Sequence, residues 1–84
     1  MDWRKNAGYI ITTSITIGEC EIVLGVHETK PNDFVIWECN KNNYANAYHT
    51  TNLIEAQKEF CIRGALKAEF YEKKTKKKSP EPER

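Results

Sequence analysis

The hydrophobic period of this 84-residue chain changes once, near Asn52, and this change constrains the fold more than any other feature. Before Asn52, apolar side chains alternate with polar ones, which is the pattern of strands that bury one face of a sheet. After it, apolar side chains recur at intervals of three and four residues, as on one side of a helix. We therefore predict an α+β fold in which strands precede one C-terminal helix.

Four segments carry the strand pattern, and the short links between them predict an antiparallel meander. Gly18 stands at the first central position of a two-residue link, which suits a type II′ hairpin turn. Gly25 lies on the other face of its strand from the apolar side chains and leaves room for a bulky group above it. The third segment is apolar on both sides, so we expect it in the middle of the sheet. The predicted strands are residues 8–17, 20–26, 34–40 and 44–49.

The predicted helix begins after Asn52, because Asn52 and Glu55 have the spacing of a capping box. Gly64, in the middle of the helical segment, indicates a close approach to the sheet. We expect the helix to pack on one face of the sheet, with Phe60 meeting Trp37 as the largest apolar groups on facing elements. The predicted fold is thus a four-stranded antiparallel meander with one C-terminal helix, in the order ββββα.

Charge divides the chain into two parts. Residues 1–72 carry seven basic and ten acidic side chains, whereas residues 73–84 carry six basic and two acidic ones. The first part has the size of a single small domain with one hydrophobic core. The second part has no apolar periodicity and contains Pro80 and Pro82, so we predict that it is a basic, disordered tail.

The cysteines and histidines do not have the pattern of a metal or catalytic centre. The three cysteines are far apart, and no pair of them has the short spacing of zinc ligands. An odd number of scattered cysteines favours reduced thiols over a disulfide framework. With no secretory signal and no apolar run long enough to span a bilayer, the expected location is cytoplasmic. We predict that the protein binds no metal or cofactor and is not an enzyme.

The sheet face that the helix leaves open is the expected binding surface. Exposed aromatic side chains on a small domain are typical of a contact with another protein. Acidic residues lie beside these aromatics in the sequence and would form a rim around them. The predicted partner-binding residues are Phe34, Tyr44 and Tyr48, with Asp33 and Glu38 as the acidic rim.

Several strings of residues, in order and at matching spacing, carry a family resemblance. They are residues 8–11, 16–18, 23–26, 30–32, 35–39 and 56–58, together with Cys61 and Arg63. On these strings the chain resembles a family of small proteins encoded in integrative and conjugative elements of gut Firmicutes. It departs from the family at residues 44–49, where relatives have an aromatic-rich segment ending Trp-Gly-His-Tyr. The resemblance implies a mobile-element accessory protein and no enzymatic activity.

Three functions remain open. Accessory proteins of mobile elements often bind and disarm host defences, and some anti-CRISPR proteins are similar in size and charge, so the first is inhibition of a Cas9-type complex. An acidic sheet edge would then occupy a site built for nucleic-acid phosphates. The second is nucleic-acid binding, with sheet aromatics stacking on bases and lysines on phosphates. The third is a structural domain that dimerises through its sheet edge or open face. The lysines of the second hypothesis are Lys73, Lys74, Lys76, Lys77 and Lys78.

Overall fold

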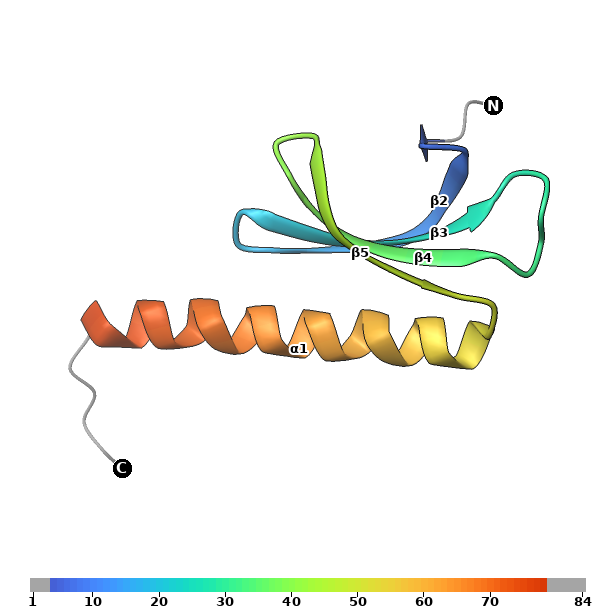
Figure 1. The fold of residues 1–84 in the computed structure, drawn as a ribbon. Coiled ribbons are helices and arrows are strands. Elements are labelled where there is room, and N and C mark those ends of the chain that lie inside the picture. The colour runs from blue at the N-terminus through green and yellow to red at the C-terminus, as the bar shows by residue number, and fades with distance from the viewer. Residues whose placement is uncertain (1–3, 79–84) are drawn as a thin grey trace.

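The computed structural model describes residues 4–78, the last four of them through the backbone alone. They form an α+β unit in which one long helix lies along one face of an antiparallel sheet (Figure 1). The five strands lie side by side in chain order, as a meander requires. The elements are β1 (Lys5–Asn6), β2 (Tyr9–Ile17), β3 (Cys20–His27), β4 (Phe34–Asn40), β5 (Asn43–Thr50) and α1 (Leu53–Lys78).

The α+β class, the antiparallel meander and the C-terminal helix are confirmed, but the sheet has five strands rather than four. The additional strand, β1, pairs Lys5 with Ile10 and Asn6 with Tyr9. Ala7 and Gly8 form the link, both with positive φ, at 51° and 85°. A strand of two residues shows no alternation, so hydrophobic periodicity cannot reveal it.

α1 begins where the sequence predicts. The Asn52 side-chain oxygen accepts a hydrogen bond from the Glu55 backbone N–H at 3.0 Å, as an N-cap does. The Glu55 carboxylate accepts a hydrogen bond from the Thr50 hydroxyl at 2.8 Å, which ties the end of β5 to the first turn of the helix.

The other end of α1 corrects the predicted tail. The helix runs through residues 73–78, which the charge pattern assigns to a disordered segment. Lysine is a good helix former, and positive charge at a helix C-terminus complements the helix dipole. The predicted tail therefore begins no earlier than residue 79, and residues 79–84 lie outside the described part of the chain.

A β-bulge in β2 changes which side chains face the helix. Ile11 pairs with Gly25 and Thr13 pairs with Leu24, so Thr12 is an extra residue in β2. One extra residue reverses the alternation of all that follow. Tyr9 and Ile11 lie on the face away from α1, whereas Ile15 and Ile17 approach the helix at Gly64. Unbroken alternation through residues 8–17, as the strand pattern predicts, would place all four on one face, and the bulge divides them.

A second bulge lies in β5 and separates the two tyrosines of that strand. Ile36 pairs with Tyr48 and Glu38 pairs with Ala45, so both Asn46 and Ala47 stand opposite Trp37. Asn46 has a φ of 56°, in the left-handed region that asparagine tolerates better than most residues. Tyr48 consequently packs on the helix side of the sheet and Tyr44 on the other.

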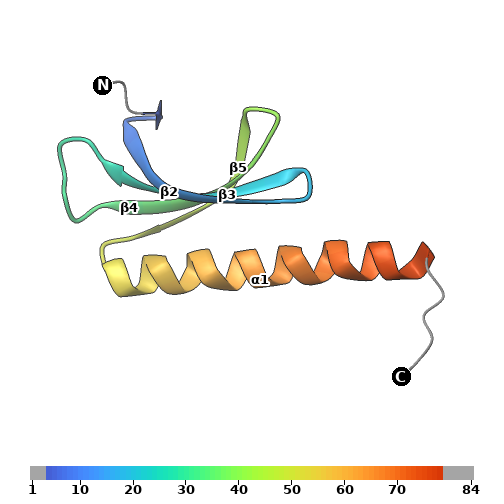
Figure 2. The ribbon, with the colours of Figure 1, turned by 180° about the vertical axis from the view of Figure 1, so that it is seen from behind.

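The sheet carries a hydrophobic core on each face. It curls away from α1, because its N-terminal end and its β4–β5 end both rise on the side opposite the helix (Figure 2). We call the two clusters the helix-side core and the concave-side core. Trp37 belongs to the second and Phe60 packs against the first, so the predicted Trp37–Phe60 contact is wrong. The helix-side core contains Cys20, Ile22, Leu24, Phe34, Ile36 and Ala56, and the concave-side core contains Tyr9, Ile11, Val23, Val35 and Trp37.

Candidate functional surfaces

The concave face, which we predicted to be open, is filled by its own aromatic side chains. Trp37 stands edge-on between Tyr9 and Tyr44, with ring centroids 5.6 and 5.3 Å away. Only 6% of its surface is exposed. Tyr9 packs over Gly25, as the predicted space above this glycine allows. A Cβ at position 25 would lie 3.2 Å from the Tyr9 Cβ. These aromatics therefore act as core residues.

Arg4 closes one end of the concave face. Its two terminal nitrogens donate to both oxygens of Glu21 at 2.8 and 2.9 Å, and its Nε donates to the Tyr44 hydroxyl at 2.9 Å. The guanidinium lies 5.5 Å from the centroid of the Tyr44 ring. The hydrogen bonds between Arg4 and Glu21 lower the pKa of Glu21 and raise the pKa of Arg4. A paired carboxylate of this kind offers little charge to an outside partner.

Asp33 is used in the same way at the other end. Its Oδ1 accepts a hydrogen bond from the Tyr9 hydroxyl at 2.9 Å. Burial, together with this hydrogen bond, raises the pKa of Tyr9. Asp33 thus anchors a core tyrosine and does not stand free on an acidic rim.

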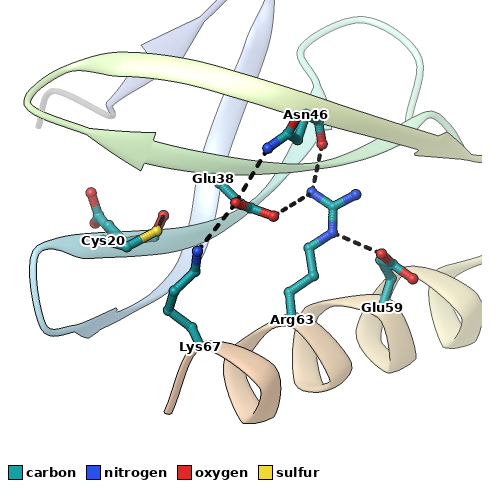
Figure 3. A network of polar contacts seen from close by, with 7 residues as sticks. Cys20, Glu38, Asn46, Glu59, Arg63 and Lys67 are labelled. Carbon is teal, nitrogen blue, oxygen red and sulfur yellow. Dashed lines mark hydrogen bonds and ion pairs between the residues drawn. The ribbon is translucent and has the colours of Figure 1, made fainter. Parts of the chain in front are cut away.

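Glu38 lies on the helix side, in a polar network that joins β4 and β5 to α1 (Figure 3). Its two carboxylate oxygens each lie 3.6 Å from a basic nitrogen, one of Arg63 and one of Lys67. Asn46 donates to the same carboxylate at 3.3 Å. Arg63 also bonds the Glu59 carboxylate at 2.7 Å and the Asn46 carbonyl. Glu38 is therefore neutralised by helix residues, and the predicted acidic rim does not form.

The five predicted partner-binding residues do not share a surface. Phe34 is buried in the helix-side core and Tyr48 packs against it, while Tyr44 contacts the concave-side core. Asp33 and Glu38 each bind a residue of the chain itself. The bulge at Asn46 is the main reason, since it places Tyr44 and Tyr48 on opposite faces.

The largest apolar exposure lies on the outer side of α1. Ile54, Ile62, Leu66 and Phe70 are 70%, 43%, 60% and 56% exposed. Together they form what we call the α1 ridge. Their positions, with Lys58 between the first two, follow one row of residues four apart, which winds around the helix by about 40° per step. The side facing the sheet uses other positions, among them the fully buried Ala56. Sequence reasoning missed this ridge although its spacing was visible, because one apolar stripe sufficed to predict the helix.

Lysines continue from the ridge toward the C-terminus of α1. Lys73 and Lys74 are exposed. The Lys74 ammonium lies 5.9 Å from the Phe70 ring centroid and 5.8 Å from that of Tyr71, which is within the range of cation–π contacts. Lys76, Lys77 and Lys78 belong to the helix by their backbone. The lysines of the nucleic-acid hypothesis thus lie at a helical end beside an apolar row.

No other type of site emerges from the described residues. The His, Cys, Asp and Glu side chains of this part of the chain do not gather in threes as metal ligands would. All three cysteines are free thiols, with Cys20 and Cys39 buried and Cys61 exposed. Within the described range, α1 is too polar to cross a bilayer, and no other helix is present. Comparison with protein-family models, curated proteins and solved structures gives no match, so the family resemblance stays a prediction.

Proposed function

We propose that this chain is a non-enzymatic protein-binding module that presents the α1 ridge to an apolar groove on a partner protein. The observation that carries the proposal is the exposure of Ile54, Ile62, Leu66 and Phe70 in one row. Single exposed apolar residues are common on soluble proteins, but adjacent large ones, such as Ile62, Leu66 and Phe70 on successive turns of α1, mark an interaction surface.

The spacing of the ridge favours recognition of a helix by a groove. In that mode, anchors recur along one side of the helix and fill successive pockets of the partner. Ile62, Leu66 and Phe70 follow each other at steps of four residues, which cover about 12 Å of the helix axis and turn about 80° around it. Lys73 and Lys74 follow the ridge, so the matching groove would carry acidic groups at the corresponding end.

The proposed partner class is a host defence complex of the Cas9 type, encountered in the cytoplasm by a mobile-element protein. The family resemblance supports this choice, and the three free cysteines are compatible with the location. The route to inhibition differs from phosphate mimicry, because basic residues of the chain neutralise Glu21 and Glu38, and Asp33 accepts a hydrogen bond from Tyr9. We propose that the ridge instead occupies a groove between parts of the effector and blocks their movement.

The test compares a ridge variant with a matched control on the same helix. Ile62→Gln with Leu66→Gln removes the apolar centre of the ridge and keeps good helix formers. Gln57→Glu with Ala68→Gln changes two exposed positions of α1 outside the row of the ridge. Each tagged protein is immobilised, and retention of a purified Cas9-type effector with guide RNA, and of proteins from a nuclease-treated bacterial lysate, is measured.

We expect the ridge variant to lose at least about tenfold in affinity for a protein that wild type and control both retain, since each buried apolar anchor contributes more than 1 kcal/mol. Equal retention by the ridge variant and the control contradicts the proposal. If only nucleic acid is retained, and Lys73→Gln with Lys74→Gln abolishes retention while added salt weakens it steeply, the nucleic-acid alternative is the better one.

A further inference from the structure

The outer edge of β2 is only partly covered. β1 pairs with β2 at Tyr9 and Ile10, and the Arg4 carbonyl accepts a hydrogen bond from the Ile11 N–H at 2.8 Å. Beyond that point, no strand among the described residues pairs with β2 on this side. Residues 13–17 therefore present a row of unpaired backbone groups, which is the usual template for adding another strand.

This edge also lacks the devices that normally prevent pairing. Charged residues, proline and bulges protect most edge strands. Residues 13–17 read Thr-Ser-Ile-Thr-Ile, with no charge and no proline, and the bulge at Thr12 precedes them. The opposite edge of the sheet, β5, differs: it contains the bulge at Asn46, whose carbonyl accepts a hydrogen bond from Arg63.

A large apolar side chain and an apolar groove lie beside the free edge. Ile15, at the centre of residues 13–17, is 44% exposed although it lies on the helix side of the sheet and approaches α1 at Gly64. The groove, about 460 Å³, runs between the β2 edge and the helix. It is lined by Thr12 and Thr13 of β2, Leu24 of β3, and Leu53, Phe60 and Cys61 of α1.

We propose that a second copy of this chain pairs with the free edge, β2 against β2, to form one continuous ten-stranded sheet. A two-fold axis through Ile15 pairs Ile15 with Ile15 of the second copy, Ser14 with Thr16, and Thr13 with Ile17. All paired side chains then share a face, as antiparallel pairing requires. Both helices lie on the same side of the joint sheet.

Charge and space favour a second copy over an unrelated strand. Two-fold pairing brings the residue on the axis against itself, and a neutral edge avoids repulsion there and along the strand; residues 13–17 carry no charge. In this register, Ile17 of the second copy comes beside Thr13, at the rim of the groove. The new pairing uses residues 13–17 alone and stops short of Ile11, whose N–H donates to the Arg4 carbonyl. β1 therefore stays paired with β2 in both copies.

The first experiment measures association of the full chain by sedimentation equilibrium over a range of concentrations. Five residues a side make a small interface, so we expect a monomer–dimer equilibrium in the micromolar range. Ile15→Lys places two like charges opposite each other and should weaken the dimer at least about tenfold. The matched control, Leu66→Lys, puts the same charge on a similarly exposed residue of the α1 ridge and should leave the dimer unchanged.

The second experiment reads the register with cysteines and keeps Ile15. In a Cys61→Ser background, Ser14→Cys and Thr16→Cys are prepared with tags of different size, mixed, and oxidised. Directly opposed residues have Cα atoms about 4.5–5.5 Å apart, within the range of a disulfide. Diagonal neighbours, at about 7–8 Å, are too far apart.

We expect a covalent dimer only in the mixture of the two variants. A monomer at all concentrations, an association that Ile15→Lys leaves intact, or crosslinking of Ser14→Cys with itself overturns the proposed pairing. The result is separable from the proposed function: Ile15→Lys should retain the partner that the α1 ridge binds, whereas Leu66→Lys should dimerise and lose it.

Discussion

The two outer surfaces of this protein, the concave face of the sheet and the exposed side of α1, use apolar side chains in opposite ways. The concave face buries Trp37 between Tyr9 and Tyr44, and Arg4 closes it by binding Glu21. The exposed side of α1 leaves Ile54 and Leu66 more than half exposed. The comparison teaches that aromatic content alone does not locate a binding surface, since in this fold the aromatics of the sheet stabilise the domain.

The largest predicted effect separates the two surfaces by stability. Trp37→Ala removes a side chain that is 6% exposed and should lower the free energy of unfolding by about 3–5 kcal/mol. Leu66→Ala removes one that is 60% exposed and should change it by less than about 0.5 kcal/mol. Urea unfolding followed by circular dichroism measures both. Similar losses for the two variants would mean that the two surfaces do not differ as described.

An intermediate effect is expected at the bulge that places Tyr44 on the concave face. Asn46→Val puts a β-branched residue at a φ of 56° and removes the hydrogen bond to Glu38, so it should cost about 1–3 kcal/mol. Asn46→Gly keeps the backbone conformation free of strain and should cost less than about 1 kcal/mol. Thermal unfolding of the two variants gives the comparison. If valine is tolerated as well as glycine, the bulge is not the conformation that the chain needs there.

The smallest effect concerns the ion pair that closes the concave face, and it depends on pH. Arg4 holds the pKa of Glu21 below its ordinary value of 4.5. As the pH falls, Glu21 is therefore protonated in the unfolded chain before it is protonated in the native protein. The stabilisation of the native protein by the Arg4–Glu21 pair is present above pH 4.5 and is lost as the pH falls through the native pKa of Glu21. Because the pair is partly exposed, we expect Glu21→Gln to cost less than about 1 kcal/mol at pH 7 and nothing measurable near pH 2.

The control for this prediction is the same substitution made in an Arg4→Gln protein. Without the guanidinium, the effect of Glu21→Gln should depend less on pH, because only the hydrogen bond from Ser14 still lowers the pKa of Glu21. Stability measured by urea unfolding at pH 7 and in acid completes the double-mutant cycle. A cost of Glu21→Gln that does not shrink in acid would show that Arg4 does not stabilise the Glu21 carboxylate.

Local features of this fold could be predicted from the sequence. The alternation of the strands and the short links between them predicted the meander, and Asn52 with Glu55 marked the start of α1. Gly18 was predicted to lead the β2–β3 turn, and it has a φ of 62°. Each of these depends on neighbours within a few residues, where propensity and capping rules apply directly.

The candidate site could not be predicted because it depends on which face each side chain takes. Thr12 and Asn46 each add one residue to a strand, and a single added residue moves every later side chain to the other face. Pairing of Glu38 with Arg63, or of Arg4 with Glu21, joins residues that only the folded register brings together. The α1 ridge was visible as spacing, but which of two apolar stripes meets the sheet is decided by packing.

The most direct test of the central claim is the isoleucine-methyl NMR spectrum of the protein with and without the partner that it retains. Ile54 and Ile62 report on the α1 ridge, Ile11 on the concave face, and Ile22 and Ile36 on the buried helix-side core. We predict that the partner shifts or broadens the methyl signals of Ile54 and Ile62 and leaves those of Ile11 and the buried core unchanged. A perturbed Ile11 with unchanged Ile54 and Ile62 would place recognition on the concave face and contradict the account.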